Sequence, residues 1–217
     1  MKRVTKKESS QARKFANDII ELFHKEFKNK YTFTQRIVGS AVYNTILKDK
    51  EGFYDVDYQL LLTKNSKEYK TNGLKNTTII KNDFFNCIND VLKNNKKYKV
   101  ENSTTAITVI NLKEKYSIDF VIIRMFPKND EIIRRNNKKN SSINEYTWNK
   151  LHKYNDAYKK FYLLSATEKN NLIENYILPR KVKEKSKNDN DPTKRSSSEL
   201  FIEEVNNYVV EKWNNRL

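Results

Sequence analysis

Apolar residues alternate between helical and extended spacing along the first half of the chain. Residues 11–28 carry apolar side chains at helical intervals, which predicts an amphipathic helix. The run Phe33–Val38, which is rich in β-branched and aromatic residues, predicts a strand that ends at Gly39-Ser40. A short helix is expected over 41–48. Tyr54–Leu62 then predicts a second strand, with an apolar end.

The pattern continues with helical spacing over 83–94 and with three strands over 98–102, 105–112 and 116–124. Pro127 is expected to end the sheet-forming region, so that everything beyond it is helical. Lys183–Arg195 has almost no apolar residue and predicts a surface loop or a disordered hinge.

Three helix starts in the second half share one signature, in which a Ser accepts from a backbone N–H and a Glu three residues later reaches back. They predict helices over 143–161, 166–178 and 197–214. The pairs are Ser142/Glu145, Ser165/Glu168 and Ser196/Glu199.

The composition indicates a folded, basic protein. The 217 residues are enough to bury a genuine core, and Lys and Arg outnumber Asp and Glu by 43 to 27, for a net charge of +16. Such a surface attracts polyanions, although a solvated surface rich in Lys and Asn explains the charge equally well. The chain has no membrane-spanning run and a single cysteine, Cys87, so it is expected to lie in the reducing cytoplasm. It is also expected to be a monomer.

Two carboxylates stand one residue apart in the second strand. In Tyr54-Asp55-Val56-Asp57-Tyr58, strand geometry projects both from the same face. Two magnesium ions about 4 Å apart need bridging carboxylates of this kind, and such ions neutralise charge on attacking and leaving oxygens.

A third carboxylate lies in the last predicted strand, where Asp119 is the only charged residue of Ser117–Ile123. Burying it unpaired is costly. Each like-charge pair among three such carboxylates repels by about 3 kcal/mol at an effective dielectric near 20, so the arrangement makes sense when divalent metal offsets it.

Upstream, Val38-Gly39-Ser40-Ala41 joins a strand to the predicted short helix. Gly39 allows the backbone to approach an anion closely, free N–H groups point at it, and the Ser40 hydroxyl adds a donor. Each of these features is weak alone, but their order along the chain favours a nucleotidyltransferase.

Residues 37–62 and 116–123 resemble the core pattern of the nucleotidyltransferases of the DNA polymerase β superfamily, and the Gly39-Ser40-x4-Thr45 spacing is most similar to the branch that contains cyclic GMP–AMP synthase and its bacterial relatives. The resemblance implies an α+β fold, with a mixed five-stranded sheet, flanking helices and a helical lobe. It divides the chain into a catalytic core over 1–127 and a helical lobe over 128–217.

The same resemblance implies an NTP substrate and two Mg²⁺ or Mn²⁺ ions held by Asp55, Asp57 and Asp119. Gly39, Ser40 and Thr45 would bind the nucleotide. Lys181 and Ser197 match by position the basic residue and the Ser-Ser helix start that contact the triphosphate in this branch. Where relatives place an aromatic residue for stacking on the base, this chain has Ser198, and it has no Cys/His cluster for a zinc insertion.

Other functions fit less well. A Ser/His/Asp hydrolase would have to use His24 or His152, both within predicted helices, and three glycines exclude a dinucleotide-binding fingerprint. The main rival is a catalytically idle RNA-binding module that uses the basic patches over 93–97 and 134–139. Within the enzyme class, the acceptor stays open between a second nucleotide, which we favour, an RNA 3′ end, an antibiotic and a protein.

Overall fold

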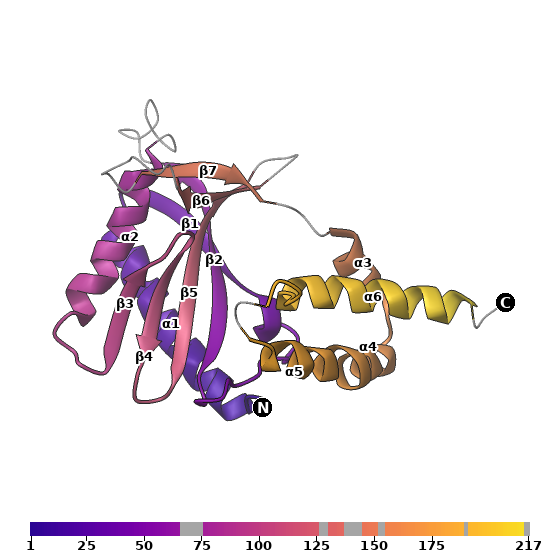
Figure 1. The fold of residues 1–217 in the computed structure, drawn as a ribbon. Helices are drawn as coiled ribbons and strands as arrows, with labels where there is room; N and C mark the ends of the chain where they lie inside the picture. Colours follow the sequence, from indigo (N-terminus) through magenta and orange to yellow (C-terminus); the bar gives the residue numbers. More distant parts are fainter. Residues whose placement is uncertain (66–75, 126–129, 137–144, 152–154, 189–190, 215–217) are drawn as a thin grey trace.

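The computed structural model describes residues 1–65, 76–125, 130–136, 145–151, 155–188 and 191–214. In these residues a mixed sheet stands beside a group of helices from the C-terminal half of the chain (Figure 1). The predicted α+β class is therefore confirmed.

The sheet has seven strands, arranged in the order β1-β2-β5-β4-β3, with β6 paired to β5 and β7 paired to β6. Only the β2–β5 pair is parallel, and the other pairs are antiparallel. All five predicted strands are present. The strands are β1 (Tyr31–Val38), β2 (Tyr54–Asn65), β3 (Tyr98–Asn102), β4 (Ala106–Asn111), β5 (Tyr116–Arg124), β6 (Glu131–Arg135) and β7 (Tyr146–Lys150).

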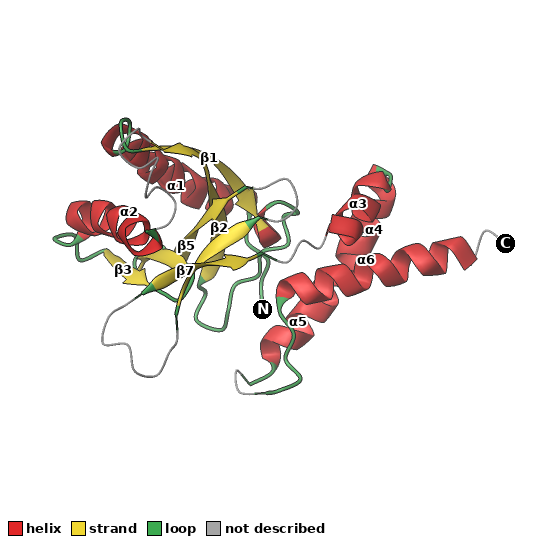
Figure 2. Cartoon of the chain, turned by 90° about the horizontal axis from the view of Figure 1, so that it is seen from above, coloured by secondary structure: helices red, strands yellow, loops and turns green. Residues whose placement is uncertain are grey.

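Two helices cover one face of the sheet, and four form a helical lobe to one side of it (Figure 2). The first helix begins at a capping box between Thr5 and Glu8, earlier than the sequence pattern predicted. The helices are α1 (Lys6–Glu26), α2 (Thr77–Leu92), α3 (Asn155–Leu163), α4 (Ala166–Leu172), α5 (Leu178–Ser186) and α6 (Ser197–Asn214).

Alternation over Tyr54–Leu60 of β2 and Ile118–Ile122 of β5 gives this part of the sheet one apolar face and one open face. Val56, Leu60, Ile118, Phe120 and Ile122 are fully buried in the main core, which α1 and α2 complete. Because successive side chains of a strand point to opposite faces, the residues between them, including all three aspartates, lie on the other face.

The expectation that the chain is purely helical beyond Pro127 is wrong. The predicted helix over 143–161 is replaced by β7 and the shorter α3, and β6 also lies beyond Pro127. β-branched and aromatic residues in Tyr146–Lys150 suit a strand that completes the sheet beside β6, and this tertiary pairing outweighs the helical spacing. Ser142, the proposed cap, lies outside the described residues.

The other helix predictions in this half need smaller corrections. The helix expected over 166–178 is α4, which continues through a π-helical segment, Ile173–Ile177, into α5. The Ser165/Glu168 capping box is present, and so are the reciprocal Ser196 and Glu199 hydrogen bonds before α6. The loop predicted from Lys183 begins only after Ser186.

The buried apolar residues form two separate clusters. The main cluster extends to Ile133 and Tyr146, whereas the second begins at Ala157 and belongs to the helical lobe. A boundary at residue 127 would cut through the sheet, so we propose that the catalytic core extends to β7 and that the helical lobe begins with α3.

Several minor expectations concern single side chains. His24 stacks on Phe33 with ring centroids 4.2 Å apart, consistent with a packing role, while His152 lies outside the described residues. Burial and two nearby acidic groups raise the pKa of the Cys87 thiol to about 11, which keeps it protonated and unreactive. None of the helices among the described residues has the length and hydropathy that a membrane span requires.

The capping box at Ser165 should contribute measurably to stability. Ser165→Ala removes the side-chain acceptor of the α4 N-terminus and should cost about 1 kcal/mol, or roughly 2–4 °C in thermal unfolding for a chain of this size. Thr167→Ala, which changes an exposed residue inside the same helix, should leave the melting temperature unchanged or slightly raised. Equal losses in both variants would mean that the cap is not responsible.

Candidate active site

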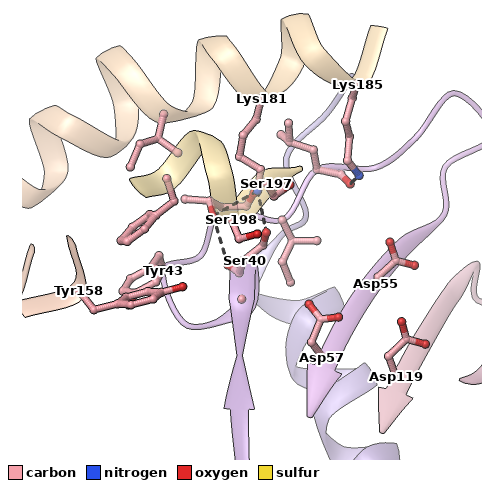
Figure 3. Close-up of a pocket in the computed structure, with 16 residues that line it drawn as sticks. Ser40, Tyr43, Asp55, Asp57, Asp119, Tyr158, Lys181, Lys185, Ser197 and Ser198 are labelled. Atoms are coloured by element: carbon pink, nitrogen blue, oxygen red, sulfur yellow. Dashed lines mark hydrogen bonds between the residues drawn. The ribbon is translucent and has the colours of Figure 1, made fainter. Parts of the chain in front are cut away.

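Parallel pairing of β2 with β5 brings the three aspartates together. In this register Asp57 lies opposite Asp119, and Asp55 lies opposite Ser117. All three aspartates line one pocket of about 290 Å³ between the open face of the sheet, the Gly39-Ser40 segment and the helical lobe (Figure 3).

Two hydroxyl groups that the sequence analysis missed hold these carboxylates. Ser117 Oγ donates to Asp55 Oδ1, and Thr108 Oγ1 donates to Asp119 Oδ1 over 2.6 Å. Ser117 is detectable in the sequence because it shares a strand face with Asp119, two residues away. Thr108 is not, since it faces Asp119 only through the pairing of β4 with β5.

The site holds more negative charge than its surroundings easily accommodate. Burial raises the pKa of Asp57 to about 6, with further contributions from Asp119 and Asp55, while Lys181 and Lys185 oppose the shift. Burial also raises the pKa of Asp119, partly offset by the Thr108 hydrogen bond. The expected repulsion among the carboxylates is therefore present.

The Gly-Ser loop, residues 39–47, faces the aspartates. It is not the helix predicted over 41–48: only Gly39–Ala41 forms a 3-10 turn, and Asn44 has a φ of +53°, which breaks a right-handed helix. Gly39 has a φ of +65°, and a Cβ there would lie 2.7 Å from Asp57 Oδ2. Glycine is therefore required both by the backbone and by the approach of the loop to the carboxylate.

Lys181 from α5 reaches across to this loop. Its buried Nζ donates to Ser40 Oγ and to the Thr45 carbonyl, each over 2.7 Å. Burial, and the neighbouring Lys185, lower the pKa of Lys181 to about 8. Thr45 lines the pocket as well, but its side chain is 4% exposed and its main contacts are with Ser40 and Lys181.

Lys185 is a second cation that the sequence analysis missed. It lines the pocket one helical turn after Lys181 and donates to the Leu47 carbonyl over 3.1 Å. The i, i+4 spacing places both amines on one face of α5, which could have been recognised once Lys181 was singled out.

The start of α6 forms another wall of the pocket. Ser197 and Ser198 line it, whereas Ser196 is the cap residue that exchanges hydrogen bonds with Glu199. Ser197 therefore lines the same pocket as Lys181 and the Gly-Ser loop.

Aromatic rings close the end of the pocket near Ser198. Tyr43 stacks on Phe201 with ring centroids 4.8 Å apart, and Tyr158 stacks on Phe201 at 5.1 Å. These rings come from the Gly-Ser loop, α3 and α6, so no local motif could reveal them. They supply apolar, planar surface that position 198 itself lacks.

No protein-family model matches the sequence, and no curated protein matches it. Solved structures do match. Escherichia coli DncV bound to 3′-deoxy GTP gives a TM-score of 0.70 at 11% identity, covering 95% of this chain and 69% of that one. The chain has the CD-NTase fold.

Two further structures with the CD-NTase fold are similar. The STING-associated CdnE c-di-GMP synthase from Capnocytophaga granulosa gives a TM-score of 0.63 at 17% identity, over 94% of this chain and 61% of that one. The Vibrio cholerae cyclic AMP-GMP synthase DncV gives 0.59 at 14% identity, over 82% and 45%. The chain thus spans 45% to 69% of the length of these three proteins.

The three aspartates offer carboxylate oxygens, which are ligands that Mg²⁺ accepts. Among the residues that the structure describes, no group of three or more His, Cys, Asp and Glu side chains is arranged to hold an ion by itself. Yet Asp57 and Asp119 carry the raised pKa values that a bound cation would reverse. Mg²⁺ commonly uses one or two carboxylates together with substrate phosphates, which fits this donor set.

The raised pKa of Asp57 should make metal-free stability depend on pH. The folded protein holds this proton more tightly than the unfolded chain, so the stabilisation is complete below about pH 4 and lost as pH rises through the folded pKa of about 6. In EDTA, the unfolding free energy of wild type relative to Asp57→Asn should fall by about 1–2 kcal/mol between pH 4 and pH 7. Chemical denaturation at each pH measures it.

Asp18→Asn, which changes an exposed carboxylate on α1, is the matched control and should keep the wild-type pH dependence. If Asp57→Asn follows the wild-type curve in parallel, Asp57 does not carry the raised pKa.

Proposed function

We propose that this chain is a metal-dependent nucleotidyltransferase, which transfers an NMP from an NTP to a hydroxyl acceptor with release of pyrophosphate. The observation that carries the proposal is the pocket itself, in which three carboxylates face Gly39, Ser40 and two lysines. Acid on one side and cationic donors on the other match the two needs of this reaction, metal ligation and triphosphate binding.

The aspartates would bind metal, and the residues opposite them would bind the triphosphate. Asp55 and Asp57 would hold two Mg²⁺ or Mn²⁺ ions, with Asp119 as a further ligand of one of them. When bound, such ions neutralise charge on the attacking and leaving oxygens. Ser40, Lys181, Lys185 and Ser197 would donate to phosphate oxygens as Gly39 lets the backbone approach.

The reaction exchanges one phosphorus–oxygen bond for another. The acceptor oxygen bonds to the α-phosphorus, the bond to the bridging oxygen of pyrophosphate breaks, and Asp119 takes the hydroxyl proton. Thr108 Oγ1 donates to Asp119 Oδ1, which holds this carboxylate in one orientation on the pocket wall.

A nucleotide is the acceptor we favour, which would give a cyclic or linear oligonucleotide. The structural neighbours include a c-di-GMP synthase and a cyclic AMP-GMP synthase. The half-buried rings of Tyr43 and Tyr158, which stack on the buried Phe201, would supply surface for a base. An RNA 3′ end, an antibiotic or a protein would use the same carboxylates, so the product has to be identified directly.

The rival RNA-binding module has less support from the side chains. In the patch over 134–139, Arg135 is engaged by the Asn102 carbonyl and Tyr146, and residues 137–139 lie outside the described part. In the other patch Lys93 pairs with Asp90. Strongly salt-dependent RNA binding without magnesium, unchanged in Asp57→Ala, would favour the rival.

Turnover should depend on Asp57. Incubating the protein with each radiolabelled NTP and Mg²⁺ or Mn²⁺, then resolving the products, should reveal a transfer product and pyrophosphate. Asp57→Asn should retain less than about a hundredth of the wild-type rate, because a lost metal ligand removes several kcal/mol of transition-state stabilisation. Asp18→Asn should be fully active, and substantial turnover by Asp57→Asn would contradict the assignment.

The two serines that start α6 should separate binding from stability. Ser197→Ala should raise the nucleotide Kd with almost no change in melting temperature, because Ser197 faces the pocket. Ser196→Ala should instead cost roughly 1 kcal/mol of stability through the lost cap. Calorimetric titration and thermal unfolding distinguish them, and unaltered binding by Ser197→Ala would reduce the segment to a cap.

A further inference from the structure

The Gly-Ser loop is held by its carbonyl groups instead of by a helix of its own. On the side of the helical lobe, Lys181 donates a hydrogen bond to the Thr45 carbonyl and Lys185 donates one to the Leu47 carbonyl. Other donors come from the opposite side, from the N-terminal segment and α1. They are Val4 N to the Ile46 carbonyl at 3.0 Å, Arg3 Nε to the Asn44 carbonyl at 2.7 Å and Arg13 Nη2 to the Ala41 carbonyl at 2.7 Å.

Of the donors from the N-terminal side, Arg13 contacts the loop nearest to the candidate active site. Ala41, which it holds, directly follows Gly39 and Ser40, and Gly39 packs against Asp57 so closely that a Cβ would clash. A shift of the Ala41 peptide would therefore move both the Ser40 hydroxyl and the contact with Asp57. The Arg13 hydrogen bond is charge-assisted, which makes it a strong anchor for this peptide.

Arg13 acts from behind the loop. Together with Ser9, Ala41, Val42 and Asn44 it lines a separate cavity of about 330 Å³, to which none of the three aspartates contributes. Its guanidinium is thus placed to orient the loop without contacting a ligand in the active-site pocket, which Arg13 does not line.

Arg13 reaches the loop through Nη2, while its Nε makes no hydrogen bond to the described residues. That Nε is buried, and an unpaired buried donor is destabilising. What the arginine supplies is the directed bond to the Ala41 carbonyl.

We propose that Arg13 is a positioning residue for nucleotide binding. By fixing the Ala41 peptide it keeps Gly39 against Asp57 and the Ser40 hydroxyl within reach of Lys181, which is the arrangement a triphosphate would meet. The proposal rests on the proposed function for its ligand, an NTP, but its structural part concerns the order of the loop in the free protein.

The test compares Arg13→Met and Arg13→Lys with wild type. Hydrogen exchange of peptides covering residues 39–47, measured by mass spectrometry on the free protein, should accelerate in Arg13→Met while β5 and α6 keep their wild-type rates. The Kd for non-hydrolysable ATP and GTP analogues with Mg²⁺ should rise by up to about tenfold, because binding must then order a loop that the hydrogen bond keeps ordered in the free wild-type protein. Arg13→Lys, which retains a cationic donor, should recover most of both effects.

Lys14→Met changes the adjacent, exposed lysine and should alter neither measurement. Unchanged loop exchange in Arg13→Met would overturn the proposal, and so would faster loop exchange with an unchanged Kd. If Arg13→Met does not fold, Arg13→Gln replaces it as the variant without a cationic donor and is compared with Arg13→Lys in both measurements. A wild type that binds neither nucleotide would overturn the proposed function, and loop exchange alone would then decide whether Arg13 orders the loop.

Discussion

The register between β2 and β5 is the constraint on which the candidate site depends. Pairing Asp57 with Asp119 across two parallel strands requires that Val56 and Leu60 on one strand and Phe120 on the other enter the core together. A slip of one residue would bury the carboxylates and expose the core, so burial of the apolar face fixes the position of the charged one. Burial of the apolar face therefore holds the three carboxylates close together, although their mutual repulsion opposes this arrangement.

The second requirement is a positive counterpart, and it comes from outside the sheet. Lys181 and Lys185 project from the helical lobe onto the Gly-Ser loop, and Arg13 reaches the same loop from α1. The loop is therefore shaped by side chains from both ends of the chain. The positive φ of Asn44 prevents a helix over 41–48, and the hydrogen bonds from these cations satisfy carbonyls that a helix would otherwise have paired.

The aspartates and the lysines on the two sides of the pocket each reduce the pKa shift of the other. Burial and the neighbouring carboxylates raise the pKa of Asp57, and burial and Lys185 lower that of Lys181, but each residue partly offsets the shift of the other. Groups held away from their ordinary pKa values in one cleft are characteristic of functional sites. A cation beside the aspartates and an anion beside the lysines would satisfy both groups at once.

The sequence by itself determined the five central strands, the helices α1, α2 and α6, and the three aspartates, because a period of two or of 3.6 residues is a local property that burial on one face imposes directly. It also identified Gly39, Ser40, Lys181 and Ser197 as candidates. Only the tertiary structure decided that Tyr146–Lys150 is a strand, since that depends on the free edge of β6. Thr108, Lys185 and Arg13 likewise became visible only through contacts between elements distant in sequence, which no local spacing encodes.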